Sequence, residues 1–169
     1  DAPAASASRR TTLPALPLTG GCQCGTIRYE IRAAPQVFYL CHCTECQRQT
    51  SSAYGESLRV DPASLVISGE MATTRRMADS GAARLGDFCP DCGVRIQHRS
   101  QGNPGRVNIK AGTLDDTSWL VPAGHIWTAS RQPFVAIGPD ELDYPGAPAD
   151  NFAALIARWQ EMVRPEDGA

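Results

Sequence analysis

The spacing of the seven cysteines constrains this 169-residue chain more than any other feature. They stand in two close pairs and one triplet: Cys22-x-Cys24, Cys41-x-Cys43-x-x-Cys46 and Cys89-x-x-Cys92. An odd number of cysteines cannot close entirely into disulfides within one chain, and close pairs are typical of metal thiolates in a reducing compartment. We therefore interpret the cysteines as metal ligands, with a secreted disulfide scaffold as the weaker alternative.

The two pairs, Cys22 with Cys24 and Cys89 with Cys92, can complete one tetrahedral zinc site. Four thiolates close the coordination shell, which predicts a structural zinc that ties an early hairpin to a later one. Gly25 directly follows the first pair, as Gly93 follows the second, and glycine lets the backbone turn tightly under a metal. The alternative is four reduced cysteines without a metal.

The triplet Cys41, Cys43 and Cys46 can hold a second zinc and leave its fourth position open, as in catalytic zinc sites. His42 is an alternative fourth ligand that would close this site. Adjacent side chains in extended backbone point to opposite sides, which disfavours ligation by three consecutive residues. A different grouping, such as Cys41 with Cys89, stays open at this point.

The pattern between the cysteines predicts a mainly β fold. From Leu18 onward, short β-rich segments are separated by Gly and Pro, and residues 26–31 alternate in hydrophobicity with a period of two. Further strands are predicted at 57–60, 65–68, 83–88, 94–98, 107–111, 125–128 and 134–137, and turns at Ser68-Gly69 and Asn103-Pro104-Gly105.

Two helices are predicted. A short one begins near Cys43 and runs through Gln49. A second occupies the end of the chain, with Asp150 or Asn151 as its cap. Its apolar stripe consists of Phe152, Leu155, Ile156, Trp159 and Val163. Such a stripe favours packing on the protein's own sheet over binding a partner.

The domain organisation follows from length and composition. Residues 1–15 are rich in Ala, Ser and Pro and are predicted to be a flexible tail. Residues 16–149 form the predicted zinc-binding domain, and residues 150–169 the C-terminal helix and tail. The whole suits one domain, since domains have about 100–150 residues.

Charge and hydropathy exclude two classes of partner. The net charge of −2 and the absence of aromatics interleaved with a basic run argue against nucleic acid, although a local basic patch is compatible with this balance. No run of about 18 apolar residues predicts a membrane span. The first ten residues lack a hydrophobic core segment, so we expect no signal peptide and a cytoplasmic protein.

The motifs occur along the chain in the order found in one known family, and the chain resembles that family: the glutathione-dependent formaldehyde-activating enzymes and their centromere-protein-V-like relatives. The resemblance is carried by Cys22-Gln-Cys24-Gly, Cys41-His-Cys43-Thr-Glu-Cys46-Gln-Arg48 and Cys89-Pro-Asp-Cys92-Gly. The later stretches Lys110-Ala-Gly-Thr-Leu-Asp115 and His125-Ile-Trp127 are similar to it too, so that it covers roughly residues 18–137.

The resemblance implies a β-tent fold of small antiparallel sheets around a structural zinc on Cys22, Cys24, Cys89 and Cys92. It also implies a second zinc on Cys41, Cys43 and Cys46 as the catalytic site. The family's named activity joins formaldehyde to glutathione and is classed as a carbon–sulfur lyase. Ser51-Ser52 departs from the Thr-Gly that the family often carries. Another carbonyl or hydroxyl substrate, or a non-catalytic zinc-stabilised interaction module, therefore remain alternatives.

Candidate substrate contacts are basic, because glutathione carries two carboxylates. Arg48 and Arg131 could each pair with one of them through the planar guanidinium, and a solvated surface role is the alternative. His125 is a candidate proton shuttle or a structural histidine, and Glu45 an acid–base group or an exposed first-turn residue. The expected partner is a small-molecule substrate, and a homodimer is compatible with the sequence.

Overall fold

The computed structural model describes residues 9–78 and 80–165, which form thirteen strands, two α-helices and three short 3-10 helices. The described residues fall into two compact units, each made from separate stretches of the chain. The first unit contains the described residues up to 13 together with 37–55 and those from 119 onward. The second contains 14–36 and 56–118.

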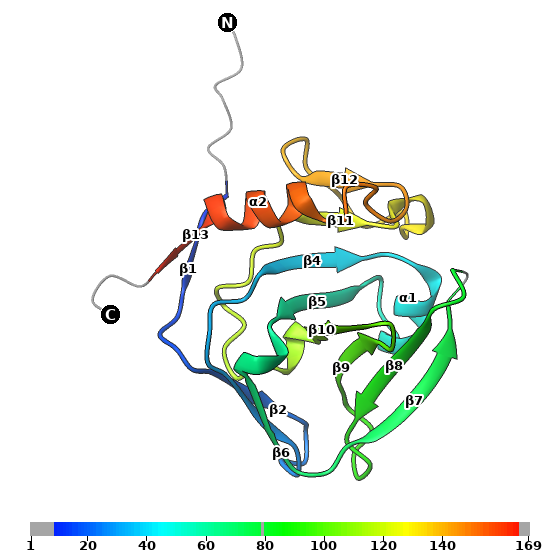
Figure 1. The fold of residues 1–169 in the computed structure, drawn as a ribbon. Helices are drawn as coiled ribbons and strands as arrows, with labels where there is room; N and C mark the ends of the chain where they lie inside the picture. Colours follow the sequence, from blue (N-terminus) through cyan, green and yellow to red (C-terminus); the bar gives the residue numbers. More distant parts are fainter. Residues whose placement is uncertain (1–8, 79, 166–169) are drawn as a thin grey trace, which may run out of the picture. The chain divides into compact units, whose positions relative to one another are not determined.

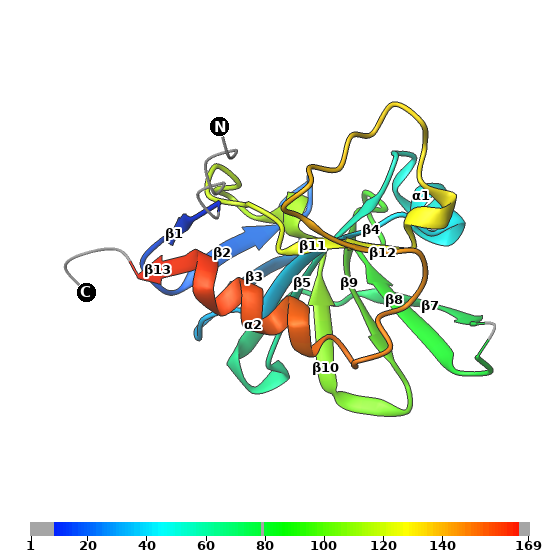
Figure 2. The ribbon, with the colours of Figure 1, turned by 90° about the horizontal axis from the view of Figure 1, so that it is seen from above.

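The first unit combines short parallel strands with both α-helices. Its elements are β1 (Thr11–Leu13), β4 (Val37–Cys41), α1 (Thr44–Thr50), β11 (Gly124–Ile126), η3 (Thr128–Ser130), β12 (Leu142–Tyr144), α2 (Ala153–Met162) and β13 (Val163–Pro165). Strand β11 pairs in parallel with β4 on one side and β12 on the other, and β1 pairs in parallel with β13. Figures 1 and 2 show α2 lying along β4.

The second unit is antiparallel. Its elements are β2 (Leu18–Gly21), β3 (Arg28–Ile31), β5 (Gly55–Val60), η1 (Pro62–Ser64), β6 (Leu65–Ser68), β7 (Ala72–Met77), β8 (Ala83–Phe88), β9 (Arg95–Ser100), β10 (Asn103–Ile109) and η2 (Ala111–Thr113). One sheet has the order β2-β3-β6, and the other strands of this unit follow the order β5-β10-β9-β8-β7. This arrangement confirms the mainly β prediction.

The C-terminal helix is confirmed at Ala153–Met162, but two residues of the predicted stripe lie outside it, since Phe152 precedes the helix with a positive φ and Val163 begins β13. Leu155 and Trp159 are buried, and the Trp159 ring lies 6.2 Å from that of Phe38 in β4, edge to face. The Asp150 carboxylate accepts hydrogen bonds from the amides of Phe152 and Ala154, so it caps the first turn as predicted. Burial of this stripe explains why the helix packs on its own unit.

The strand predictions fail where the pattern lacks alternation or where a loop merely resembles a strand. Strand β4 was not predicted, because all five of its residues are buried and show no period of two. The exposed polar strand β7 carries too little apolar character to be recognised. Residues 134–137 are not a strand, and Phe134 is 78% exposed. The predicted turn at 103–105 lies inside β10, since the chain reverses at Gln101 and Gly102 instead.

The predicted domain limits differ from the observed units. Within the predicted tail 1–15, Thr11–Leu13 form β1, while residues 1–8 lie outside the described residues, as do 166–169. The helix at the end of the chain is not a separate segment, because α2 belongs to the same compact unit as β4. Residues Thr11–Leu13 have a defined conformation because β1 pairs with β13.

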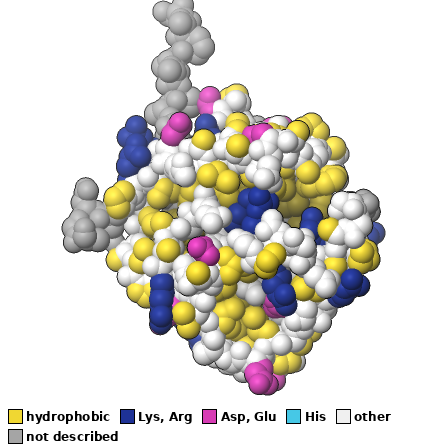
Figure 3. Space-filling model, in the orientation of Figure 1, with side chains coloured by type: hydrophobic (Ala, Val, Ile, Leu, Met, Phe, Trp, Pro, Cys, Tyr) yellow, Lys and Arg dark blue, Asp and Glu magenta, His cyan; other side chains and the backbone are white. Residues whose placement is uncertain are grey.

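Figure 3 shows one face of the molecule, on which Lys and Arg side chains stand in several separate groups among polar and apolar surface. Across residues 9–78 and 80–165, no helix is long and apolar enough to cross a membrane.

Candidate metal centres

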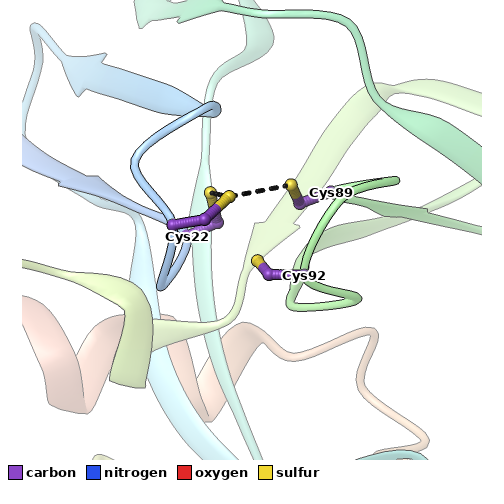
Figure 4. Close-up of side chains that lie close together, drawn as sticks. Cys22, Cys89 and Cys92 are labelled. Carbon is purple, nitrogen blue, oxygen red and sulfur yellow. Dashed lines mark hydrogen bonds between the residues drawn. The ribbon is translucent and has the colours of Figure 1, made fainter.

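The first cysteine cluster joins two loops of the second unit. Cys22 and Cys24 lie between β2 and β3, and Cys89 and Cys92 lie in the tight turn between β8 and β9. Figure 4 shows Cys89 and Cys92 on one loop, with their sulfur atoms facing that of Cys22 on the other. All four Sγ atoms lie within 4.8 Å of one another, as the spacing predicts.

The distances between the sulfur atoms fit a shared metal and exclude disulfides. The Sγ atoms of Cys22 and Cys24 are 3.5 Å apart, and those of Cys24 and Cys89 are 3.6 Å apart. A disulfide needs about 2.05 Å. Zinc–sulfur bonds of about 2.3 Å in a tetrahedron place the sulfur atoms about 3.8 Å apart. The residues present therefore fit a four-thiolate zinc site.

Backbone amides prepare this cluster for negative charge. The amide of Ile27 donates to the Cys22 Sγ at 3.2 Å, and the Val94 amide is the main cause that lowers the pKa of Cys92 to about 6. Burial instead raises the pKa of Cys89 to about 11. Since one thiol resists ionisation beside its neighbours, a bound cation is what would allow all four to be thiolates. Gly93 adopts a positive φ of 78°, which the tight turn requires.

The second cluster lies in the first unit at the junction of β4 and α1. Cys41 ends β4, Cys43 is the N-terminal cap of α1, and Cys46 lies in its first turn. Their Sγ atoms lie within 4.8 Å of one another, and the Cys46 amide donates to the Cys43 Sγ at 3.3 Å. Hydrogen bonds with Cys41 and Cys46 lower the pKa of Cys43, while hydrogen bonds with Cys43 and Cys46 raise the pKa of Cys41. These contacts favour ionisation of Cys43 over ionisation of Cys41.

His42 does not join the second cluster. Its ring is fully buried, and its Nε2 lies 2.9 Å from the Nδ1 of His125 in β11. Among the described residues, only the three cysteines bring ligand atoms within 4.8 Å of one another here. The cluster therefore offers three donors, as expected for an open site, and the alternative with His42 as fourth ligand is not what the structure shows.

His42 and His125 belong to a buried polar chain. The Nε2 of His125 lies 2.8 Å from the Glu141 carboxylate, which also accepts from Arg9 at 2.7 Å. With Glu141 as acceptor, His125 donates through Nε2 and accepts at Nδ1 from His42. Burial lowers the pKa of His42 to about 4, with a further contribution from His125, so its imidazole is neutral at pH 7. Both ring nitrogens of His125 are therefore engaged in hydrogen bonds.

A second network holds the cysteine loop by its backbone. The carbonyl of His42 accepts hydrogen bonds from the Gln47 side-chain amide and from the Ser130 hydroxyl, each at 2.8 Å. The Gln47 side-chain amide also donates to the backbone carbonyl of Ser130, and the Gln132 side-chain amide donates to Oε1 of Gln47. Sequence reasoning missed these residues because their partners are distant in the chain. The only local signal was the Gln that follows the third cysteine of the triplet.

The two predicted substrate contacts, Arg48 and Arg131, differ in whether they line a pocket. Arg48 lines an open pocket of about 700 Å³ together with side chains of α1 and of the loops 51–54 and 132–134. Its side chain is 80% exposed and lies 3.8 Å from Glu45, one helical turn earlier. Arg131 is exposed and its charge contributes to the low pKa of His42, but it does not line this pocket. Glu45 is thus an exposed first-turn residue paired with Arg48.

Comparison with known proteins assigns the chain to a family. The sequence profile of the glutathione-dependent formaldehyde-activating enzyme family matches residues 17–130. This match spans both cysteine clusters and most of the chain. The protein belongs to this family.

Individual relatives are distant. A protein of Halomonas elongata, named "Putative glutathione-dependent formaldehyde-activating enzyme", is 26% identical over 159 residues, which cover 89% of this chain and 99% of that protein. A crystal structure of a Rhodobacter sphaeroides protein is 16% identical and covers 75% of this chain and 99% of its own, with a TM-score of 0.47.

We predict that the two clusters respond differently to loss of one thiol. Cys89→Ser removes a buried ligand that joins two loops, and the metal energy of such a site, about 10–16 kcal/mol, is folding energy. This variant should lose folded yield and zinc, measured by circular dichroism and metal analysis. Cys46→Ser, the matched variant in the second cluster, should stay folded. A folded Cys89→Ser protein with its full metal content would contradict the assignment.

The buried histidine chain generates a second prediction. Glu141→Ala leaves the buried His125 N–H without its acceptor, which should lower the free energy of unfolding by about 1–3 kcal/mol in urea denaturation. Asp140→Ala removes the neighbouring exposed carboxylate and should stay within about 0.5 kcal/mol of the parent. Equal effects of the two substitutions would show that the chain does not stabilise the unit.

Proposed function

We propose that the protein is a zinc-dependent enzyme that adds a thiol of the glutathione type to a small aldehyde such as formaldehyde, or catalyses the reverse. The observation that carries this proposal is the presence, in a chain of this family, of two separate cysteine clusters with different numbers of donors. Four thiols suit a structural site, whereas three leave a coordination position for chemistry. Seven free thiols suit a reducing cytoplasm, where we expect the enzyme to act.

In this proposal, Cys22, Cys24, Cys89 and Cys92 hold the structural zinc. The catalytic zinc is held by Cys41, Cys43 and Cys46. When bound there, zinc would supply positive charge that stabilises a thiolate near neutral pH. The overall reaction forms one carbon–sulfur bond, and the thiol proton ends on the new hydroxyl group. This stoichiometry corresponds to a carbon–sulfur lyase acting in the direction of synthesis.

The chain's own residues position the site and its substrate. The hydrogen bonds of Gln47 and Ser130 hold the carbonyl of His42 and so fix the loop between Cys41 and Cys43. The pocket beside α1 has a mixed polar and apolar lining that includes Thr44 and Tyr54, and Arg48 is its cationic group. We propose that Arg48 pairs there with a carboxylate of the thiol substrate. Arg131 remains a second candidate for such a contact.

A different carbonyl or hydroxyl substrate is the alternative that a specific observation favours. Ser51 and Ser52 stand in the pocket wall where the resemblance leads one to expect Thr-Gly. Ser51 has a positive φ of 53°, a conformation that favours glycine, so the loop is built around an unusual residue. The two hydroxyl groups alter the pocket's hydrogen-bonding capacity and with it the substrate that fits.

The named reaction can be tested directly. Formation of S-hydroxymethylglutathione from formaldehyde and glutathione is followed by exchange NMR, and the spontaneous rate is subtracted. Zinc-loaded protein should accelerate the exchange, and Cys46→Ser should abolish the acceleration while keeping its fold. Zinc-loaded, folded protein that gives no acceleration would exclude this substrate pair and favour a different substrate or a zinc-stabilised interaction module.

Arg48→Gln tests the proposed carboxylate contact in the same assay. Because the side chain is exposed, its ion pair should contribute modestly, and we expect KM for glutathione to rise about two- to fivefold with little change in kcat. Arg32→Gln is the matched control, since Arg32 is also an exposed arginine paired with a nearby glutamate. A KM equal to that of the parent would remove Arg48 from the binding site.

A further inference from the structure

The pocket beside α1 lies entirely within the first unit. One side of its wall is a single face of the helix and its C-terminal cap, where residues three or four positions apart lie next to one another. These residues are Thr44, Gln47, Arg48 and Ser51. The wall is completed by residues 52–54 and by Gln132 and Phe134, which come from the same unit. One compact part of the chain therefore defines the pocket.

A β-turn brings the aromatic ring of Phe134 to this pocket. The Val135 amide donates to the carbonyl of Gln132 at 3.1 Å, which closes a turn over residues 132–135. Pro133 occupies the second position of this turn, where its fixed φ is favoured, and Phe134 occupies the third. Among the large hydrophobic residues that the structure describes, Phe134 is the most exposed, at 78%. The turn thus presents a largely uncovered aromatic side chain at the pocket wall.

Hydrogen bonds fix this turn against α1. The Gln132 side-chain amide donates to Oε1 of Gln47 at 3.0 Å. The Gln47 side-chain amide donates in turn to the backbone carbonyls of His42 and Ser130, each at 2.8 Å. The backbone that carries Phe134 is therefore in place before a ligand arrives, which reduces the entropy lost on binding.

Tyr54 connects the pocket wall to the second cysteine cluster. Its ring lies 5.4 Å from that of His42, edge to face, and His42 stands between Cys41 and Cys43. Thr44, another residue of the wall, directly follows Cys43. The pocket wall is therefore continuous with the cysteine loop, and a substrate that reacts at the cluster would place its remaining groups in this pocket.

The size and the lining of the pocket suit a ligand larger than formaldehyde. Its volume of about 700 Å³ lies within the range of about 300–1,000 Å³ that is usual for small-molecule sites. Arg48 supplies a positive charge for a carboxylate of the thiol, but neither formaldehyde nor glutathione carries a ring to match that of Phe134. Covering the exposed ring with another ring is favourable, because apolar area leaves water and the rings make stacked or edge-to-face contact.

We propose that the carbonyl substrate of this protein is an aromatic aldehyde whose ring lies against Phe134. This inference rests on the proposed function, because it names the carbonyl partner of the thiol addition. In the reaction, the thiol sulfur forms a bond to the aldehyde carbon, the carbonyl π bond breaks, and the thiol proton goes to the carbonyl oxygen. The product is a hemithioacetal that keeps the ring, and Phe134 is the residue that determines specificity for it.

The binding test uses a probe that cannot react. Benzyl alcohol has the ring of benzaldehyde without the carbonyl group, and cyclohexylmethanol is the saturated control. Binding to the zinc-loaded, full-length chain is measured from the NMR relaxation of the probe's own protons, so the same measurement serves every variant. We expect saturable binding of benzyl alcohol, with cyclohexylmethanol about threefold weaker because it lacks the aromatic contact.

Substitutions locate the bound ring. Phe134→Ala should weaken the binding of benzyl alcohol about tenfold, and Phe134→Leu, which keeps an apolar side chain, about threefold. Met77→Ala is the matched control, because Met77 is also an exposed apolar residue, at 54%, but lies in β7 of the second unit. All three side chains are replaced at exposed positions, so the variants should stay folded.

Kinetics with two aldehydes then separate this inference from the proposed function. Phe134→Leu should lower kcat/KM for benzaldehyde with glutathione about threefold and leave that for formaldehyde unchanged. Equal binding of benzyl alcohol to the parent and to Phe134→Ala, or tighter binding of cyclohexylmethanol, would overturn the aromatic substrate even where formaldehyde is accelerated. Binding that depends on Phe134 in a protein that accelerates neither aldehyde would overturn the proposed function instead, and leave an aromatic ligand site.

Discussion

The second unit depends on the meeting of two thiol pairs that are distant in the chain. Cys22 and Cys24 come from one loop and Cys89 and Cys92 from another, and all four sulfur atoms lie within 4.8 Å. Bringing such distant loops together costs conformational entropy, and placing thiolates side by side costs electrostatic energy. A cation offsets both costs, because its binding energy becomes folding energy. The two loops belong to the hairpins β2–β3 and β8–β9, on which the structure of this unit depends.

The second cluster is built differently, and this difference supports a different role. Its three thiols lie within six residues, so no distant loops need to be joined by a metal. The protein itself positions these three thiols. They lie at the N-terminus of α1, and the loop that carries them is held by the hydrogen bonds of Gln47 and Ser130 and by the buried pair of His42 and His125. A site held this way can lose or exchange a ligand without unfolding its surroundings, which catalysis requires.

The features that the sequence alone could predict are the local ones. The spacing of the cysteines within each pair and within the triplet, the cap at Asp150 and the buried residues Leu155 and Trp159 of α2 follow from patterns of a few residues, and the structure shows each of them. Strand β4 escaped prediction because burial on both faces removes the alternation on which a strand prediction depends. The contact of His42 with His125 joins residues 83 apart, so no local pattern encodes it.

The central claim is that the clusters hold two zinc ions with closed and open coordination. Native mass spectrometry of the full chain, during stepwise addition of a zinc chelator, tests it most directly. The account predicts two zinc ions per chain, of which one leaves early from folded protein and the other leaves only with unfolding. Simultaneous loss of both ions, or a single zinc in the fully loaded chain, would contradict it.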